Sequence, residues 1–129
     1  HNIQVPFAFN RKEAKDHGEG GQIIGADLNG KVMIIDDVIT AGTAINQAAK
    51  LIRSQGADIA AIIIAFDRQE RNNQNATAVD ALEKVYNLRI ESIFNFADLV
   101  KFLSNQQANQ KSYIDILDKL NAYHQRYGI

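Results

Sequence analysis

The sequence contains no cysteine and no tryptophan, and it has only one proline among 129 residues. Without cysteine there is no disulfide framework, no thiolate metal site and no thiol nucleophile. No apolar run approaches the roughly 20 residues of a membrane-spanning helix, and the N-terminus shows no signal-peptide pattern. We therefore expect a cytoplasmic protein with no membrane partner.

A dominant charge is also missing, because 14 basic residues balance 15 acidic ones and give a formal net charge of -1. Such a chain has no basic field to attract nucleic acid, so we expect no nucleic-acid partner. With 46% hydrophobic residues it can bury a core, and residues 1–129 are predicted to form a single domain. The chain starts at His1, without an initiator methionine and just before the apolar stretch IQVPFAF. We expect an N-terminal segment to be missing.

Short apolar runs alternate with amphipathic helical patterns along the chain, which predicts an α/β fold with a mainly parallel sheet flanked by helices. The polar, glycine-rich stretch Asn10–Gln22 between them predicts a mobile loop or a flexible hairpin. The continuous apolar run Lys31–Ile35 is typical of a strand covered on both faces. The expected strands are Ile3–Phe9, Lys31–Ile35, Ile59–Phe66 and Arg89–Phe94, and the expected helices are Thr43–Gln55, Ala76–Tyr86, Phe96–Leu103 and Tyr113–Tyr127.

Two adjacent carboxylates, Asp36 and Asp37, follow the strand in the stretch VMIIDDVITAGTAI. Like charges at this distance repel, so a ligand is one candidate for offsetting the cost. The turn after them is small and rich in hydroxyl groups, and it opens a helix whose N-terminus favours anions. Gly42 can adopt a backbone conformation that directs successive N–H groups inward. The stretch therefore predicts a phosphate cradle beside two acceptors for sugar hydroxyls.

This pattern resembles the motif of the type I phosphoribosyltransferases that binds 5-phosphoribosyl 1-pyrophosphate (PRPP). The resemblance implies a catalytic role for Asp36 and Asp37, which would hold the ribose and stabilise an oxocarbenium-like centre. The alternative is an ordinary strand-to-helix turn with a threonine cap and incidental acids. The PRPP-binding residues implied in this stretch are Asp36, Asp37, Val38, Ile39, Thr40, Ala41, Gly42, Thr43 and Ala44.

A second stretch, FNRKEAKDHGEGG, resembles the mobile catalytic loop of the orotate phosphoribosyltransferases. Arg11, Lys12, Lys15 and His17 match loop residues that contact pyrophosphate oxygens in that family. The resemblance implies that all four bind PRPP and that Lys12, Lys15 and His17 are catalytic. Cationic donors stabilise the charge of departing pyrophosphate, and His17 can donate a proton. Taken alone, the stretch is only a solvated charged segment.

The third stretch, FDRQER, places Arg68 just past a strand end. By the same resemblance Arg68 recognises orotate, pairing as a fork with its planar carboxylate or carbonyls, and Thr40 also contacts orotate. The alternative for Arg68 is a surface ion pair with Asp67 or Glu70. Arg71 is predicted to be solvated.

Aromatic side chains near the C-terminus are interpreted as structural. Tyr113, Tyr123 and Tyr127 recur at helical spacing and are predicted to pack rather than to form a stacking platform. His124 has no partners at metal-ligand spacing and is predicted to be structural or solvent-facing.

Taken together, the resemblance implies the type I phosphoribosyltransferase fold and an enzyme of pyrimidine biosynthesis. It would transfer the phosphoribosyl group from PRPP to orotate, with magnesium held mainly by PRPP and through water by Asp36 or Asp37. It also implies a homodimer whose loop reaches the neighbouring subunit, and an N-terminal hood that nothing here matches. Two alternatives stay open: a non-catalytic PRPP-sensing regulator, and a phosphoribosyltransferase acting on a purine or uracil.

Overall fold

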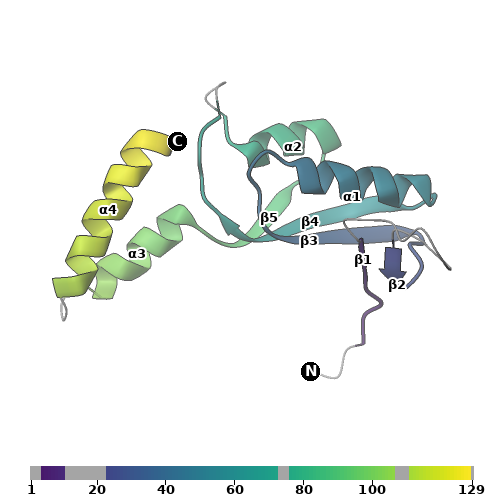
Figure 1. Ribbon diagram of the computed structural model, residues 1–129, viewed down its shortest axis with the longest axis horizontal. Helices are drawn as coiled ribbons and strands as arrows, with labels where there is room; N and C mark the ends of the chain where they lie inside the picture. The colour runs from purple at the N-terminus through teal and green to yellow at the C-terminus, as the bar shows by residue number, and fades with distance from the viewer. Residues whose placement is uncertain (1–3, 11–22, 73–75, 107–110, 129) are drawn as a thin grey trace, which may run out of the picture.

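A computed structural model of the chain describes residues 4–10, 23–72, 76–106 and 111–128. It contains a hairpin, a parallel sheet and four helices, arranged as Figure 1 shows. In chain order the elements are β1 (Ala8–Asn10), β2 (Ile23–Gly25), β3 (Lys31–Val38), α1 (Thr43–Ser54), β4 (Asp58–Asp67), α2 (Ala78–Tyr86), β5 (Ile90–Asn95), α3 (Phe96–Gln106) and α4 (Lys111–Tyr127).

The three longer strands form a parallel sheet in the order β3-β4-β5. Ile34 of β3 pairs with Ile62 of β4, and Ile62 pairs in turn with Ile90 of β5. The predicted parallel α/β arrangement is confirmed, and all three predicted strand ranges lie within the observed ones apart from Arg89. The main difference is at β3, which continues past Ile35 to Val38 and so includes both aspartates.

Helices α1 and α2 lie against the same face of the sheet (Figure 1). The helix α1 buries Ile45, Ala49 and Ile52, which recur at the spacing of one helical face. These residues join a core with the fully buried Ile62 and Ile64 of β4. The predicted helix ends close to Gly56, as expected, where a φ of 76° stops the helical geometry.

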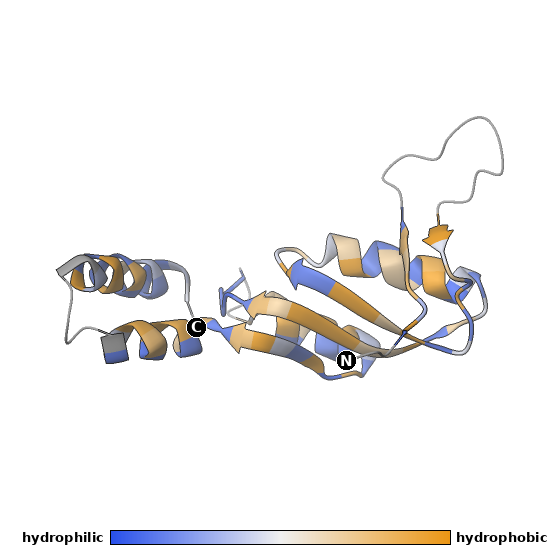
Figure 2. Ribbon diagram, turned by 90° about the horizontal axis from the view of Figure 1, so that it is seen from below, coloured by the Kyte–Doolittle hydropathy of each residue, from blue (hydrophilic) through white to orange (hydrophobic). Residues whose placement is uncertain are grey.

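The opposite face of the sheet is exposed, and this corrects the prediction of a strand covered on both faces. Met33 and Ile35 of β3 are 49% and 75% exposed, and Ile93 of β5 is 76% exposed. Figure 2 looks toward the strands from this side, where they are largely hydrophobic. The apolar run correctly indicates a strand, but no described element covers its second face.

A short antiparallel hairpin, β1–β2, lies beside the edge strand β3. Asn10 pairs with Ile23, and Ala8 pairs with Gly25, whose φ is 118°. A Cβ at Gly25 would collide with the carbonyl oxygen of Phe7, so the close strand approach requires glycine. The predicted strand Ile3–Phe9 is wrong in its bounds, because β1 begins only at Ala8 and belongs to the hairpin instead of the main sheet.

The helix α2 is closed at its start by a capping box. The Thr77 hydroxyl accepts the N–H of Asp80 at 2.9 Å, and the Asp80 carboxylate accepts the N–H of Thr77 at 3.0 Å. We expect Thr77→Ala to lower the free energy of unfolding by about 1–2 kcal/mol, because the partly buried N–H of Asp80 then loses its acceptor. Urea denaturation measures this change. Thr43→Ala is the matched control, since no side chain caps α1, and equal destabilisation by both variants would contradict the account.

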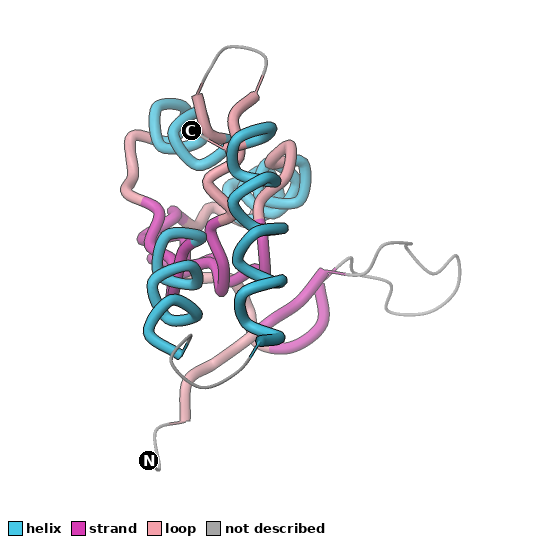
Figure 3. Tube along the Cα trace, turned by 90° about the vertical axis from the view of Figure 1, so that its left-hand side faces the viewer, coloured by secondary structure: helices cyan, strands magenta, loops and turns pink. Residues whose placement is uncertain are grey.

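The last two helices form an antiparallel pair at the far end of the sheet from the hairpin (Figures 1 and 3). Phe96 at the start of α3 is buried, and its ring stacks on His124 of α4 with centroids 5.0 Å apart. The prediction that His124 is structural is therefore confirmed. None of the described helices is both long enough and apolar enough to cross a membrane.

Candidate active site

The two aspartates lie inside β3 and consequently project to opposite faces of the sheet. Asp36 is half-buried, whereas Asp37 is exposed. Each carboxylate accepts the N–H of the next residue: Oδ1 of Asp36 at 3.0 Å from Asp37 N, and Oδ1 of Asp37 at 2.7 Å from Val38 N. The expected repulsion is thus reduced by divergence and by local hydrogen bonds, while an oxygen of each carboxylate remains for a ligand.

The turn between β3 and α1 leaves a helix N-terminus open. Helix geometry gives the N–H groups of the first turn no intrahelical partner, and no side chain of a described residue caps α1. The Gly42 backbone has a φ of 72° and is buried against Leu82 of α2. This contrasts with α2, whose capping box satisfies its own first turn. The N-terminus of α1 can therefore receive an anion, as the sequence predicts.

The predicted PRPP-binding residues of this turn differ in what they can offer. Thr40, Ala41, Thr43 and Ala44 are exposed and can face a ligand. Ile39 is only 9% exposed and belongs to the core, so its apolar side chain packs there and only its backbone can offer a polar contact.

Arg68 lines a small pocket together with residues of the turn. The pocket is formed by Ile39, Thr40, Asp67, Arg68, Gln69, Glu70, Thr77, Ala78 and Val79. Nη2 of Arg68 forms an ion pair with Glu70 at 2.9 Å. Glu70 is one of the two ion-pair partners that the sequence offered as the alternative to orotate recognition. Nevertheless, among the described residues the Nε of Arg68 is buried without a hydrogen-bond partner. A buried donor of this kind is uncommon and fits a group that a ligand completes.

The remaining predicted site residues, Arg11, Lys12, Lys15 and His17, lie outside the described residues. The stretch that carries them connects β1 to β2, and the pairing of Asn10 with Ile23 brings its two ends together. The structure therefore neither joins these four side chains to the turn nor separates them from it.

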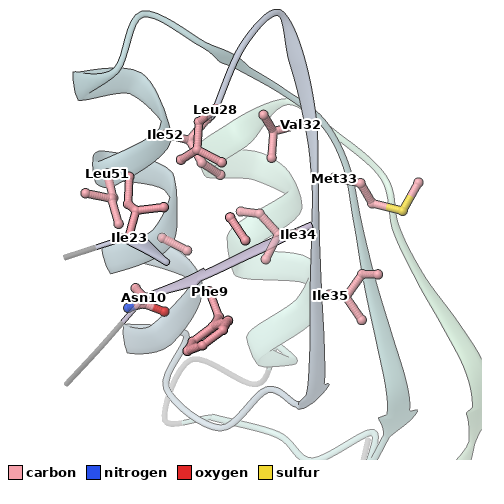
Figure 4. Close-up of a pocket in the computed structure, with 12 residues that line it drawn as sticks. Phe9, Asn10, Ile23, Leu28, Val32, Met33, Ile34, Ile35, Leu51 and Ile52 are labelled. Carbon is pink, nitrogen blue, oxygen red and sulfur yellow. The ribbon is translucent and has the colours of Figure 1, made fainter. Parts of the chain in front are cut away.

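A second pocket lies between the hairpin, β3 and α1 (Figure 4), and Arg68 is not among its lining residues. It is lined by Phe9 and Ile23 of the hairpin and by Leu51 and Ile52 of α1. Its described lining residues are all uncharged, so it offers neither a proton donor nor an anion site. We attribute no chemistry to this pocket.

A magnesium ion would find few ligands from the protein alone. Within the described ranges no three acidic or histidine side chains gather to hold a metal, and Asp36 and Asp37 diverge. Carboxylate oxygens are nonetheless suitable partners for magnesium, which retains much of its water shell. The donor set fits an ion held by a phosphorylated ligand and reached from an aspartate through water.

Sequence reasoning missed the contacts that fix Arg68. From the sequence, Glu70 was interpreted only as an ion-pair partner of Arg68, and Tyr123 only as a packing residue. In the structure the Tyr123 hydroxyl donates a hydrogen bond to Glu70, 53 positions away in the sequence. The predicted packing role of Tyr123 is also confirmed, because its ring stacks on Phe96. Arg71 is exposed as predicted, but it also donates to the carbonyl of Arg126 at 3.1 Å. No local pattern could have signalled these long-range pairs.

Comparison with known proteins identifies the family of this chain. Residues 2–105 match the model of the phosphoribosyl transferase domain. Curated proteins named orotate phosphoribosyltransferase, from Aeromonas salmonicida and Photorhabdus laumondii, are each 45% identical over 129 residues, which is 100% of this chain and 59% of theirs. A crystal structure of orotate phosphoribosyltransferase from Francisella tularensis aligns with a TM-score of 0.74 at 31% identity, covering 99% of this chain and 58% of that one.

The chain thus spans about 59% of the length of these curated relatives. The family match covers both the strand–turn–helix with the aspartate pair and the strand end that carries Arg68. The type I phosphoribosyltransferase fold predicted from the sequence is confirmed by the structural likeness. This chain belongs to the phosphoribosyl transferase domain family.

Proposed function

We propose that the protein carrying this chain transfers the phosphoribosyl group from PRPP to orotate, forming orotidine 5-monophosphate and pyrophosphate in pyrimidine biosynthesis. The family match supports the PRPP donor. The relatives that cover the whole chain are named for the orotate reaction, which supports the acceptor.

One observation carries the proposal. Thr40, which belongs to the turn at the open N-terminus of α1, lines the same pocket as Arg68, whose buried Nε has no partner among the described residues. An uncapped helix N-terminus and an unsatisfied planar donor thus lie close together at the carboxyl end of the sheet. In parallel α/β sheets this is the edge where ligands bind.

Different residues bind different parts of the two substrates. The turn from Thr40 to Thr43 anchors the 5-phosphate through N–H and hydroxyl donors, while Asp36 and Asp37 accept from the ribose hydroxyls. Arg68 and Thr40 orient orotate. The bond from the anomeric carbon to pyrophosphate breaks and the leaving oxygen keeps the electron pair. A ring nitrogen of orotate forms the new bond to carbon, and its proton is released to solvent. Asp36 and Asp37 stabilise the positive charge that develops between these events.

We propose the remaining partners on the same grounds. Magnesium, held by PRPP oxygens and through water by Asp36 or Asp37, would neutralise part of the pyrophosphate charge. The loop residues Arg11, Lys12, Lys15 and His17 contact pyrophosphate, and the protein works as a cytoplasmic homodimer in which this loop serves the neighbouring subunit.

Lys15→Ala separates catalysis from binding. We expect it to lower kcat by about 100-fold or more, because a cation placed on the leaving group acts mainly in the transition state. The dissociation constant for PRPP should change far less. Steady-state kinetics and calorimetric titration of PRPP measure the two quantities on the full-length protein, and equal losses in both would remove the catalytic role of Lys15.

A panel of acceptors distinguishes this function from its alternatives. With PRPP and the full-length protein, orotate should support turnover, whereas uracil, adenine and hypoxanthine should not. Preference for another base would assign a different phosphoribosyltransferase. Tight PRPP binding without turnover of any base would favour a non-catalytic PRPP-sensing regulator.

A further inference from the structure

The C-terminal helix holds the segment that carries Arg68. The backbone N–H of Arg71 donates to the carbonyl of Tyr127 at 2.8 Å, and Glu70 forms an isolated antiparallel bridge with Gly128. The guanidinium of Arg71 adds a hydrogen bond to the carbonyl of Arg126. Because these contacts involve the backbone at both ends, the end of α4 and residues 67–71 are fixed to one another.

A chain of side-chain contacts runs from α4 to the pocket. The Tyr123 hydroxyl donates to Oε1 of Glu70, and Oε2 of the same carboxylate pairs with Nη2 of Arg68 at 2.9 Å. Each oxygen of Glu70 thus has a partner. The Arg68 and Glu70 side chains are only 32% and 26% exposed, so water competes with the pair less than at an open surface.

Tyr123, where this series of side-chain contacts begins, is itself packed against other aromatic rings. The Tyr123 ring lies against the buried Phe96 and against Tyr127, with centroids 6.4 and 4.9 Å away. The hydrogen bond to Glu70, together with partial burial and the Glu70 charge, raises the pKa of the Tyr123 phenol above its ordinary value of 10.0, while the Arg68 charge acts in the opposite direction. The phenol is therefore a protonated donor in a fixed place at neutral pH.

We propose that Tyr123 is a positioning residue for acceptor recognition: it orients Glu70, and Glu70 orients the Arg68 guanidinium at the edge of the pocket lined by Thr40. This inference rests on the proposed function, because Arg68 is there assigned to orotate. Pre-orientation reduces the side-chain entropy that Arg68 loses on binding. The resulting gain in affinity therefore applies to orotate, which Arg68 contacts, and not to PRPP.

Tyr123→Phe tests this role, since it keeps the stacked ring and removes only the hydroxyl. On the full-length protein we expect the KM for orotate to rise about three- to tenfold, which is the effect of losing one ordinary hydrogen bond, because Tyr123 acts on orotate only through Glu70 and Arg68. The kcat and the KM for PRPP should change less than about twofold. Tyr113→Phe is the matched control, because its hydroxyl lies on the same helix and has no hydrogen-bond partner among the described residues; it should match the parent protein.

A double-mutant cycle shows whether Tyr123 acts through Glu70. In a Glu70→Gln background, Tyr123→Phe should add little to the KM for orotate, because the carboxylate that it orients is already gone. Multiplicative effects of the two substitutions would overturn the proposal. So would a parallel rise in both KM values together with a lowered melting temperature, which indicates a general structural role.

A readout independent of turnover separates failure of this inference from failure of the proposed function. Hydrogen exchange at Nε of Arg68, followed by NMR, should be slow in the parent protein and in Tyr113→Phe, and faster in Tyr123→Phe. Unchanged exchange would overturn the positioning role even in an active enzyme. A third outcome is faster exchange in Tyr123→Phe together with no orotidine monophosphate formed by the parent protein. In that case Tyr123 would still position Arg68, but orotate would not be the ligand.

Discussion

Replacing Arg68 with methionine should raise the KM for orotate by about 10- to 100-fold, with little change in the affinity for PRPP. The reason is that methionine fills similar space but provides no charged donors, and each hydrogen bond to a charged group contributes about 1.5–3 kcal/mol. Methionine also removes the buried Nε that has no partner among the described residues. The free energy of unfolding should therefore fall by less than the free energy that is lost in orotate recognition. Steady-state kinetics against each substrate measure the effect.

The matched control for this variant is Arg89→Met. Arg89 also pairs with the acid two residues later, Glu91, at 3.1 Å, but the two side chains are 82% and 59% exposed. An exposed pair of this kind contributes little, so the control should leave both KM values unchanged. If Arg68→Met behaved like Arg89→Met, the surface ion-pair interpretation of Arg68 would stand and its role in orotate recognition would fall.

Gly42→Ala should weaken PRPP binding by at least about tenfold, which corresponds to losing one charged hydrogen bond. Its φ of 72° is strained for alanine, at a cost of about 1–2 kcal/mol. In addition, the new Cβ would lie 3.0 Å from both Cδ atoms of Leu82, so the Leu82 side chain or the turn must move by a few tenths of an ångström. Relief of the φ strain within the turn moves the N–H groups that form the phosphate cradle. Calorimetric titration with PRPP gives the change in affinity.

Gly56→Ala isolates the backbone strain from the effect on the site. Gly56 has a similar φ of 76° but no atom within 4 Å of an added Cβ, and it follows the other end of α1. Both variants should lose stability, whereas only Gly42→Ala should lose PRPP affinity. Equal PRPP affinities in the two variants would show that the turn does not bind the phosphate.

The local parts of the fold were predictable because their signals are contiguous in the sequence. The α1 stripe of Ile45, Ala49 and Ile52, followed by Gly56, specifies both the buried face and the end of the helix. The open face of the sheet was not predictable, since the apolar residues Met33 and Ile35 indicate a strand suited to burial without identifying what would cover it. The three-residue strand β2 is too short for any periodicity to show.

In the candidate site, too, some features were predictable from the sequence and others were not. The end of β3 and the turn after it carry the acids, the hydroxyls and the glycine within a few residues, so this part of the site could be predicted from the sequence. The geometry of the acids could not be, because ending the strand at Ile35 concealed the alternation that separates Asp36 from Asp37. The link from Tyr123 to Glu70 depends on how α4 packs, and tertiary packing of this kind leaves no local pattern.

The central claim is most directly tested by measuring orotidine 5-monophosphate formation from PRPP, orotate and magnesium with the full-length protein. The account predicts that the product appears in equal amount with pyrophosphate, that omission of orotate abolishes pyrophosphate release, and that Arg68→Met needs far more orotate to reach the same rate. Binding of PRPP without any orotate-dependent product would contradict it.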